Sequence, residues 1–235
     1  MALILCLETS SKNCSVSIVK NGNNFLLKER FDDHYCHGEQ LHVLICDLLI
    51  EAKITLTDFD AFAYSAGPGS YTGLRIGASA TKGFAFALDK PVISISTLAS
   101  MAMGILSHNL IQNQKYDLFC PTLDSRKGEV YLGMYDNQNI EYIEPVACDI
   151  NTFNFEKHLN NNRVCFFGPG NYKLKSAIKH QNAFFLNEDY PSAKNLCALA
   201  EKKFKQRDFS DIAYFEPMYL KNFIPTKPKK GIIYK

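Results

Sequence analysis

The sequence lacks the features that define several large classes of protein. No run of uncharged apolar residues approaches the roughly 18 that span a membrane, so we expect no membrane-spanning helix. The first residues carry no basic segment and reach Glu8 early, which is unlike a signal peptide and favours a cytoplasmic protein. Charge is balanced, with 26 basic and 24 acidic residues, whereas a protein that binds RNA alone through a broad basic face usually has a larger excess.

The eight cysteines are not spaced for metal or redox chemistry. No two of them are separated by two to four residues, so there is no zinc knuckle and no CxxC pair. Several lie in apolar runs, where a reduced thiol behaves as a small hydrophobic group. The 235 residues, 46% hydrophobic and 21% charged, are typical of a globular chain with one large or two small domains.

Hydrophobic periodicity predicts an α/β protein with layered sheets and helices. In the first half it predicts these segments: strands over 2–8, 14–20, 25–31, 59–67 and 91–96, and helices over about 38–53, 72–88 and 97–108. In the second half it predicts three strands within 117–145, strands over 163–168 and 183–186, and a helix over about 192–207.

The two halves resemble each other. At an offset of 116 residues, Leu7-Glu8-Thr9 matches Leu123-Asp124-Ser125, Val16 matches Leu132 and Ile18 matches Met134. We interpret this as a duplication, although any two hairpins are alike at this level of detail. Because no Gly-, Ser- or Pro-rich linker intervenes, we expect an N-terminal domain over 1–110 packed on a C-terminal domain over 111–235.

A glycine-rich segment, GPGSYTGLRIG over 67–77, joins a predicted buried strand to a predicted helix. It is not a Walker loop, because no Gly-Lys-Ser/Thr follows, but a glycine turn at a helix N-terminus can hold a phosphate. The simpler interpretation is a tight turn that lets strand and helix pack closely. Arg75 lies in the first helical turn, where the helix dipole disfavours a cation, so we expect an anionic partner for it. The candidate residues of this loop are Gly67, Gly69, Ser70, Thr72, Gly73 and Arg75.

Two acid-hydroxyl turns are weaker candidates for a nucleotide site. Glu8-Thr9 and Asp124-Ser125 each close the first predicted strand of a half. The long glutamate and the absence of glycine favour hydrogen-bonded turns over a phosphate site.

Three histidines lie close together in the sequence at 34, 37 and 42, with Cys36 among them. On a helix His37 and His42 point about 140° apart, so we expect a solvated or interfacial role for them and no metal site. The 221–235 segment carries five lysines and no acid, which suits either contact with RNA phosphates or a disordered tail.

The helices over 38–53 and 72–88 each have a second apolar stripe opposite the one that faces the core. Either the rest of the chain covers both stripes, or they bind another protein. The residues concerned are Val43, Cys46 and Ile50 on the first helix and Ile76, Ala80 and Gly83 on the second.

Several segments together resemble the bacterial TsaB family, also called YeaZ. They are ILCLETSSKNCSVSIV, HGEQLHVLICDLL, SAGPGSYTGLRIGASATKGFAFAL and PVISISTLAS, followed by DSRKGEVYLGMY, YPSAKNLCALA and EPMYLKNF. The resemblance implies two RNase H-like halves, each a mixed sheet with helices, as in a degenerate relative of actin, Hsp70 and the sugar kinases.

The resemblance also implies an accessory role without catalysis. A TsaB-like chain pairs with a TsaD-like catalytic subunit and a TsaE-like ATPase, and the complex threonylcarbamoylates adenosine 37 of tRNA. ATP and threonylcarbamoyl-adenylate then act at the level of the complex, this chain needs no cofactor or metal, and tRNA contact is indirect. The second stripes would form the partner surface, or pair with themselves in a homodimer. The alternatives are a nucleotide-dependent small-molecule kinase or ATPase, and a proteolytic or protein-binding module.

Overall fold

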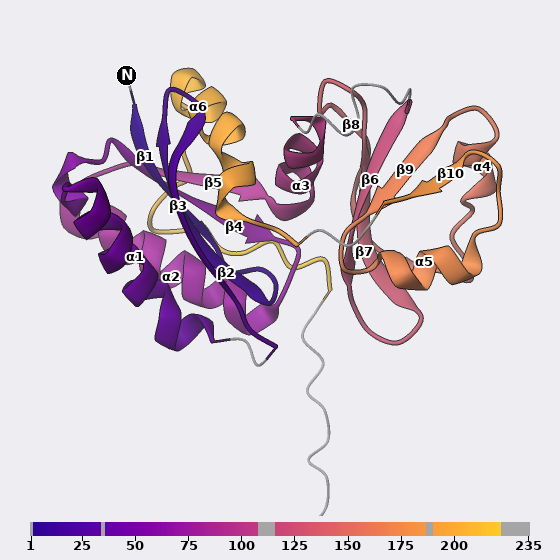
Figure 1. The fold of residues 1–235 in the computed structure, drawn as a ribbon, viewed down its shortest axis with the longest axis horizontal. Helices are drawn as coiled ribbons and strands as arrows, with labels where there is room; N and C mark the ends of the chain where they lie inside the picture. The colour runs from indigo at the N-terminus through magenta and orange to yellow at the C-terminus, as the bar shows by residue number, and fades with distance from the viewer. Residues whose placement is uncertain (1, 34–35, 108–115, 187–189, 222–235) are drawn as a thin grey trace, which may run out of the picture.

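The structure is a computed structural model that describes residues 2–33, 36–107, 116–186 and 190–221. Its first half contains a five-stranded sheet in the order β3-β2-β1-β4-β5 (Figure 1). The strands are β1 (Leu3–Glu8), β2 (Asn13–Lys20), β3 (Asn23–Phe31), β4 (Ala61–Gly67) and β5 (Val92–Ser96). β1 and β2 pair antiparallel, as do β2 and β3, whereas β4 is parallel to β1 and to β5.

The second half repeats this topology. Its sheet has the order β8-β7-β6-β9-β10, with three antiparallel strands followed by two parallel ones. The strands are β6 (Leu118–Asp124), β7 (Glu129–Tyr135), β8 (Glu141–Asp149), β9 (Val164–Phe167) and β10 (Ala183–Phe185). The predicted duplication is confirmed, and both halves are RNase H-like.

The offset of 116 residues holds for one pair of equivalent strands and is wrong for the other. Val16 and Leu132 match, because each packs against the two helices on the outer side of its sheet. Leu7 and Leu123 do not match, since Leu7 pairs with Val16 whereas the partner of Leu132 is Thr122. A shift of one residue sends side chains to the opposite face of a strand.

Two helices cover one face of the first sheet. They are α1 (His37–Ala52) and α2 (Tyr71–Leu88), with the short 3₁₀ helix η1 (Leu56–Asp58) after α1. Leu41, Leu48 and Ala85 from these helices are fully buried against β1, β2 and β4. Both predicted helices are confirmed, and each ends at a residue in the left-handed conformation, Lys53 and Asp89.

The opposite face of each sheet is covered by a helix from the other half of the chain. α3 (Thr97–Leu106) follows β5, yet its Leu98, Met101 and Ile105 pack on the second sheet. The 3₁₀ helix η3 (Ala193–Leu196) and α6 (Cys197–Gln206) follow β10 and pack on the first sheet. Figure 1 shows α3 between the two sheets and α6 beside β5. The outer face of the second sheet carries α4 (Glu156–Leu159) and α5 (Asn171–Ala177), which the sequence analysis did not predict.

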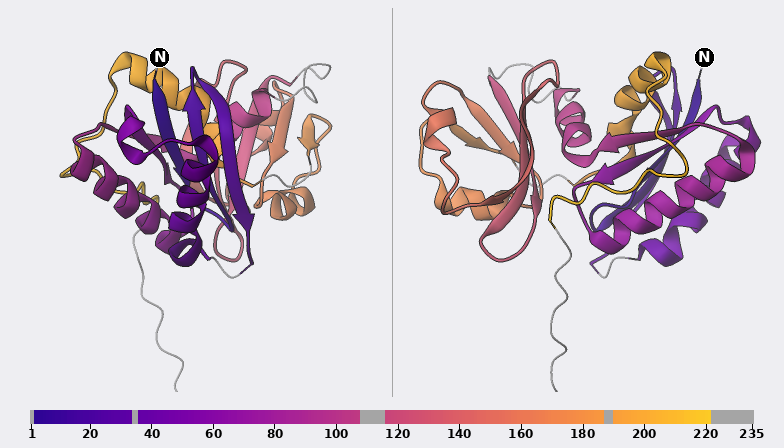
Figure 2. Two further views of the ribbon diagram at one scale, coloured as in Figure 1. Left: turned by 60° about the vertical axis from the view of Figure 1, so that its left-hand side comes forward. Right: turned by 180° about the vertical axis from the view of Figure 1, so that it is seen from behind.

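The predicted domain boundary therefore needs a correction, because the chain after Tyr190 returns to the first half. The segment after α6 runs along α2 and back toward the second half (Figure 2). The amide of Met218 donates to the carbonyl of Ala66 over 2.7 Å, and Lys221 forms an ion pair with Glu129 of β7. The first half is thus completed by residues 191–218 rather than ending near residue 110.

Among the described residues, no helix has both the length and the hydropathy required to cross a bilayer. The expected lysine-rich tail lies, apart from Lys221, outside the described residues, as does His34 of the histidine group.

Because η3 packs on the first sheet, a cavity at its buried Leu196 should destabilise the core of the first half. Leu196 is fully buried against the first sheet, so Leu196→Ala is expected to lower the free energy of unfolding by about 2–5 kcal/mol. Hydrogen exchange should become faster in β1 and β4, although these strands are more than a hundred residues away in the sequence. Lys194→Ala, at an exposed position of the same helix, is the control. Faster exchange confined to the second sheet would contradict the packing.

Candidate functional site

A groove of about 740 Å³ lies between α1 and α2 on the side away from the sheet. Its lining is Gly38 and His42 from α1, and Tyr71, Thr72, Arg75, Ile76, Ser79, Ala80, Gly83 and Phe84 from α2. The core faces of both helices are already buried, so the groove is an additional surface. No acidic side chain lines it.

The second stripes predicted on α1 and α2 are on the surface of the described structure. Ile76, Ala80 and Gly83 line the groove, as expected for one binding surface. Val43, Cys46 and Ile50 do not line it but lie exposed on α1, with Ile50 75% accessible. On α2 the stripe is only partly open, because Ile76 and Ala80 are half-buried against the core of the first half, whereas the stripe on α1 is exposed.

The sequence analysis did not predict two surface residues of α2: Phe84, which lines the groove, and Phe86, which is exposed. His42 contacts Phe84 edge-on, with ring centroids 5.8 Å apart, and this contact joins the two helices across the groove. Phe86 is 81% exposed. A signal for Phe86 was present, since it continues the spacing of Ile76 and Gly83 along one side of α2.

The glycine-rich loop holds α2 tightly against the turn after β1. Ser70 caps the helix by accepting a hydrogen bond from the amide of Gly73, and its own amide donates to the carbonyl of Ser10 over 2.7 Å. Thr9 Oγ1 donates to the carbonyl of Gly73 over 2.8 Å. A Cβ atom on Gly73 would lie 2.0 Å from the carbonyl oxygen of Thr9. Gly67 has a φ of +118°, a backbone angle that residues other than glycine rarely adopt. This geometry supports the tight-turn interpretation.

Arg75 has aromatic partners in place of the expected anion. Its Nε donates to the hydroxyl of Tyr219 over 3.0 Å, and its guanidinium carbon lies 4.2 Å from the centre of the Tyr71 ring. A cation can be stabilised by the face of an aromatic ring, which the expectation did not consider. Tyr219 is 144 residues away in sequence, so sequence spacing gave no signal for it.

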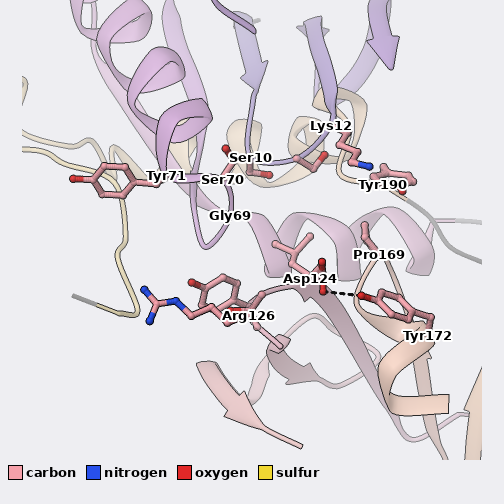
Figure 3. Close-up of a pocket in the computed structure, with 14 residues that line it drawn as sticks. Ser10, Lys12, Gly69, Ser70, Tyr71, Asp124, Arg126, Pro169, Tyr172 and Tyr190 are labelled. Carbon is pink, nitrogen blue, oxygen red and sulfur yellow. Dashed lines mark hydrogen bonds between the residues drawn. The ribbon is translucent and has the colours of Figure 1, made fainter. Parts of the chain in front are cut away.

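A cleft of about 540 Å³ separates the two halves beside the N-terminus of α2 (Figure 3). The turn after β1 and the glycine-rich loop line it from the first half, and the turn after β6 faces them. Thus Gly69, Ser70 and Asp124, which the sequence offered as separate candidates, lie around one cavity. Gly67, Thr72, Gly73 and Arg75 do not line it.

The three weaker nucleotide candidates are engaged in local structure. Glu8 is fully buried, and its Oε1 accepts a hydrogen bond from the amide of Ser10 over 2.6 Å. Burial raises the pKa of Glu8, while hydrogen bonds from Ser10 partly offset this. Thr9 is buried beneath α2. Asp124 lies at the cleft, but its Oδ1 is 2.6 Å from Lys173 Nζ and accepts from the hydroxyl of Tyr172. The hydrogen-bonded turns expected as the simpler alternative are present.

His37 and six of the eight cysteines are buried, whereas Cys36 is half-buried and Cys46 is exposed. Burial lowers the pKa of His37, opposed in part by a hydrogen bond to the backbone of Ser11. Burial raises the pKa of Cys14 and Cys165 to about 12, which disfavours the thiolate needed of a nucleophile or metal ligand. No group of three metal-ligating side chains is present within the described ranges.

The structure defines a two-domain α/β protein in which two RNase H-like sheets of the same topology meet at a cleft. Residues 34–224 match the family model described as "TsaD: tRNA N6-adenosine threonylcarbamoyltransferase". The chain is 27% identical to the tRNA threonylcarbamoyladenosine biosynthesis protein TsaB of Haemophilus influenzae, covering 97% of both chains. It is 31% identical to TsaB of Buchnera aphidicola, over 83% of this chain and 90% of the relative.

A solved structure agrees with these relatives. A Pseudomonas aeruginosa protein described as similar to the peptidase YeaZ superposes with a TM-score of 0.80 and 26% identity, over 94% of this chain and all of that chain. This chain belongs to the TsaB (YeaZ) family.

Two glycines of α2 provide a matched test of the close contact with the turn after β1. Gly73→Ala is expected to lower the free energy of unfolding by about 1–3 kcal/mol, because the new methyl group meets the backbone of Thr9. Gly83→Ala meets no atom within 4 Å and should raise stability by up to about 1 kcal/mol through helix propensity. Urea unfolding measures both. Equal effects of the same sign would contradict the contact.

The buried carboxyl of Glu8 predicts a dependence of stability on pH. Because its pKa is raised in the folded chain, the stability it contributes is complete below its unfolded pKa of about 4.3 and is lost as the pH rises through the folded value. Relative to the natural chain, Glu8→Gln should therefore be less destabilised at about pH 7.5 than at about pH 4.5. Urea unfolding of both proteins at the two pH values gives the difference. A difference that does not change with pH would show that Glu8 titrates normally.

Proposed function

We propose that this chain is an accessory subunit of tRNA threonylcarbamoyladenosine biosynthesis, which binds a TsaD-like transferase through the α1–α2 groove. The observation that carries the proposal is the exposed apolar groove, found in a chain whose TsaB relatives are named for this pathway. An apolar surface that persists after folding is typical of a protein interface.

The shape of the groove favours a helix as its occupant. Ala80 and Gly83 are small, so a partner backbone can approach α2 closely at these positions. Ile76 and Phe84 flank them and provide apolar contact area. The helix-in-groove mode uses this combination of small and bulky positions. In the absence of the transferase, the same surface would pair with a second copy of the chain.

In this proposal the chemistry belongs to the partner. The Glu8 carboxylate accepts a hydrogen bond from the amide of Ser10, and the Thr9 hydroxyl donates to the carbonyl of Gly73. Asp124 forms an ion pair with Lys173. The chain itself then supplies no cofactor site. A TsaE-like ATPase consumes ATP, and threonylcarbamoyl-adenylate binds at the level of the complex. Docking on the groove would order the active site of the transferase, in the cytoplasm.

The cleft between the halves supports one alternative function, which can be tested. A nucleotide-dependent small-molecule kinase or ATPase would bind between the halves, where Asp124 and the glycine-rich loop meet. Calorimetry of the isolated chain with ATP and Mg²⁺ separates the two proposals. Micromolar affinity together with turnover would favour the alternative.

Charged substitutions in the docking surface are expected to weaken binding to the transferase. Ile76→Glu places a carboxylate in the groove and Ile50→Arg places a cation on the exposed stripe of α1, so each should raise the Kd by about tenfold or more. Isothermal titration with the cognate TsaD-like protein measures this. Ile140→Glu is the control, because Ile140 is an exposed aliphatic residue of the second half.

Circular dichroism and thermal unfolding should show that the three variants remain folded. An unchanged Kd for both Ile76→Glu and Ile50→Arg would remove the support for this surface. An equal loss of affinity in Ile140→Glu would show that the effect is not local.

A further inference from the structure

The interdomain cleft has a cation that no described residue neutralises. Arg126, in the turn after β6, lines the cleft and is exposed. Among the described residues its guanidinium has no hydrogen bond or ion pair. The carboxylate nearest in sequence, that of Asp124, is bound to Lys173, whose Nζ also donates to the carbonyls of Ser125, Arg126 and Glu129. The turn is therefore held in place by Lys173, and Arg126 remains available to an anionic ligand.

Aromatic rings surround the same cavity. Four tyrosines line it, contributed by both halves: Tyr71, Tyr131, Tyr172 and Tyr190. Tyr172 is 54% exposed, and Figure 3 shows it on α5 beside Asp124, across the cleft from the glycine-rich loop. An exposed tyrosine ring beside a cation suits a ligand with planar groups and negative charge, as in a nucleic acid strand, where bases stack and phosphates pair with arginine.

The described cleft has few free carboxylates with which to bind a metal-bound nucleoside triphosphate. Magnesium bound with a triphosphate is usually held through one or two carboxylates. Glu8 is buried with a raised pKa, and Asp124 is already paired with a lysine. A phosphodiester needs no metal, and the exposed ring of Tyr172 can stack with a base.

We propose that the cleft binds a short single-stranded segment of RNA, with a phosphate on Arg126 and a base stacked on Tyr172. The proposal rests on the proposed function in tRNA modification for the identity of the nucleic acid, but not on the groove as the docking surface. Because the contact involves few phosphates, it agrees with the balanced net charge of the chain. Tyr71 lines both the cleft and the α1–α2 groove, so the strand lies next to the docked partner.

The test is fluorescence anisotropy of the full chain with a fluorescein-labelled RNA of about eight nucleotides at low salt. Arg126→Ala and Tyr172→Ala are each expected to weaken binding by about tenfold. Tyr172→Phe keeps the ring and should retain most of the affinity. Lys175→Ala removes an exposed charge from the same helix α5, outside the cleft, and should leave binding unchanged. A plot of log K against log salt should have a slope of about −0.7 to −1.4, as for one or two phosphates.

Three results would overturn the proposal. The first is no saturable RNA binding by the natural chain, and the second is equal binding by Arg126→Ala, Tyr172→Ala and Lys175→Ala. The third is full displacement of RNA by micromolar ATP with Mg²⁺, which would assign the cleft to a free nucleotide. Ile76→Glu should bind RNA normally, so a failure of this proposal and a failure of the docking surface are distinguished by separate variants.

Discussion

Each sheet of this protein is completed by a helix from the other half of the chain. α3 buries Leu98 and Met101 against the second sheet, and η3 with α6 buries Leu196 and Ala200 against the first. Since both faces of each sheet are then covered, neither half can keep its core without the other. Both exchanged helices lie on the inner faces of the sheets, and the outer side of α1 keeps Val43, Cys46 and Ile50 exposed.

The position of α2 determines where both candidate surfaces lie. The contact of Thr9 and Ser10 with the glycine-rich loop fixes the N-terminus of α2 against the end of β1. On one side of that terminus lies the groove toward α1, and on the other lies the cleft toward the second half, with Tyr71 at both. The buried carboxyl of Glu8 and the paired Asp124 maintain this arrangement. Glu8 and Asp124 thus hold the turns that border these two surfaces.

Much of the fold could be predicted because local patterns determine it. The strands and α1 and α2 follow from periodicity, and Ser70 caps α2 as its position indicates. The short helices α4 and α5 carry too few turns to give a periodic signal. The destination of α6 could not be predicted either, since an apolar stripe does not say which sheet it covers. The same holds for the site: outward residues such as Ile50 follow from spacing, but the pairing of Arg75 with Tyr219 depends on contacts between distant segments.

The central claim is that the chain acts by supporting a catalytic partner. It is tested most directly by reconstitution with the cognate TsaD-like and TsaE-like proteins, threonylcarbamoyl-adenylate and tRNA, in which the modified nucleoside is quantified by mass spectrometry. The account predicts that omission of this chain abolishes the modification, that its return restores it, and that the chain alone produces none. Undiminished modification without the chain, or modification by the chain alone, would contradict it.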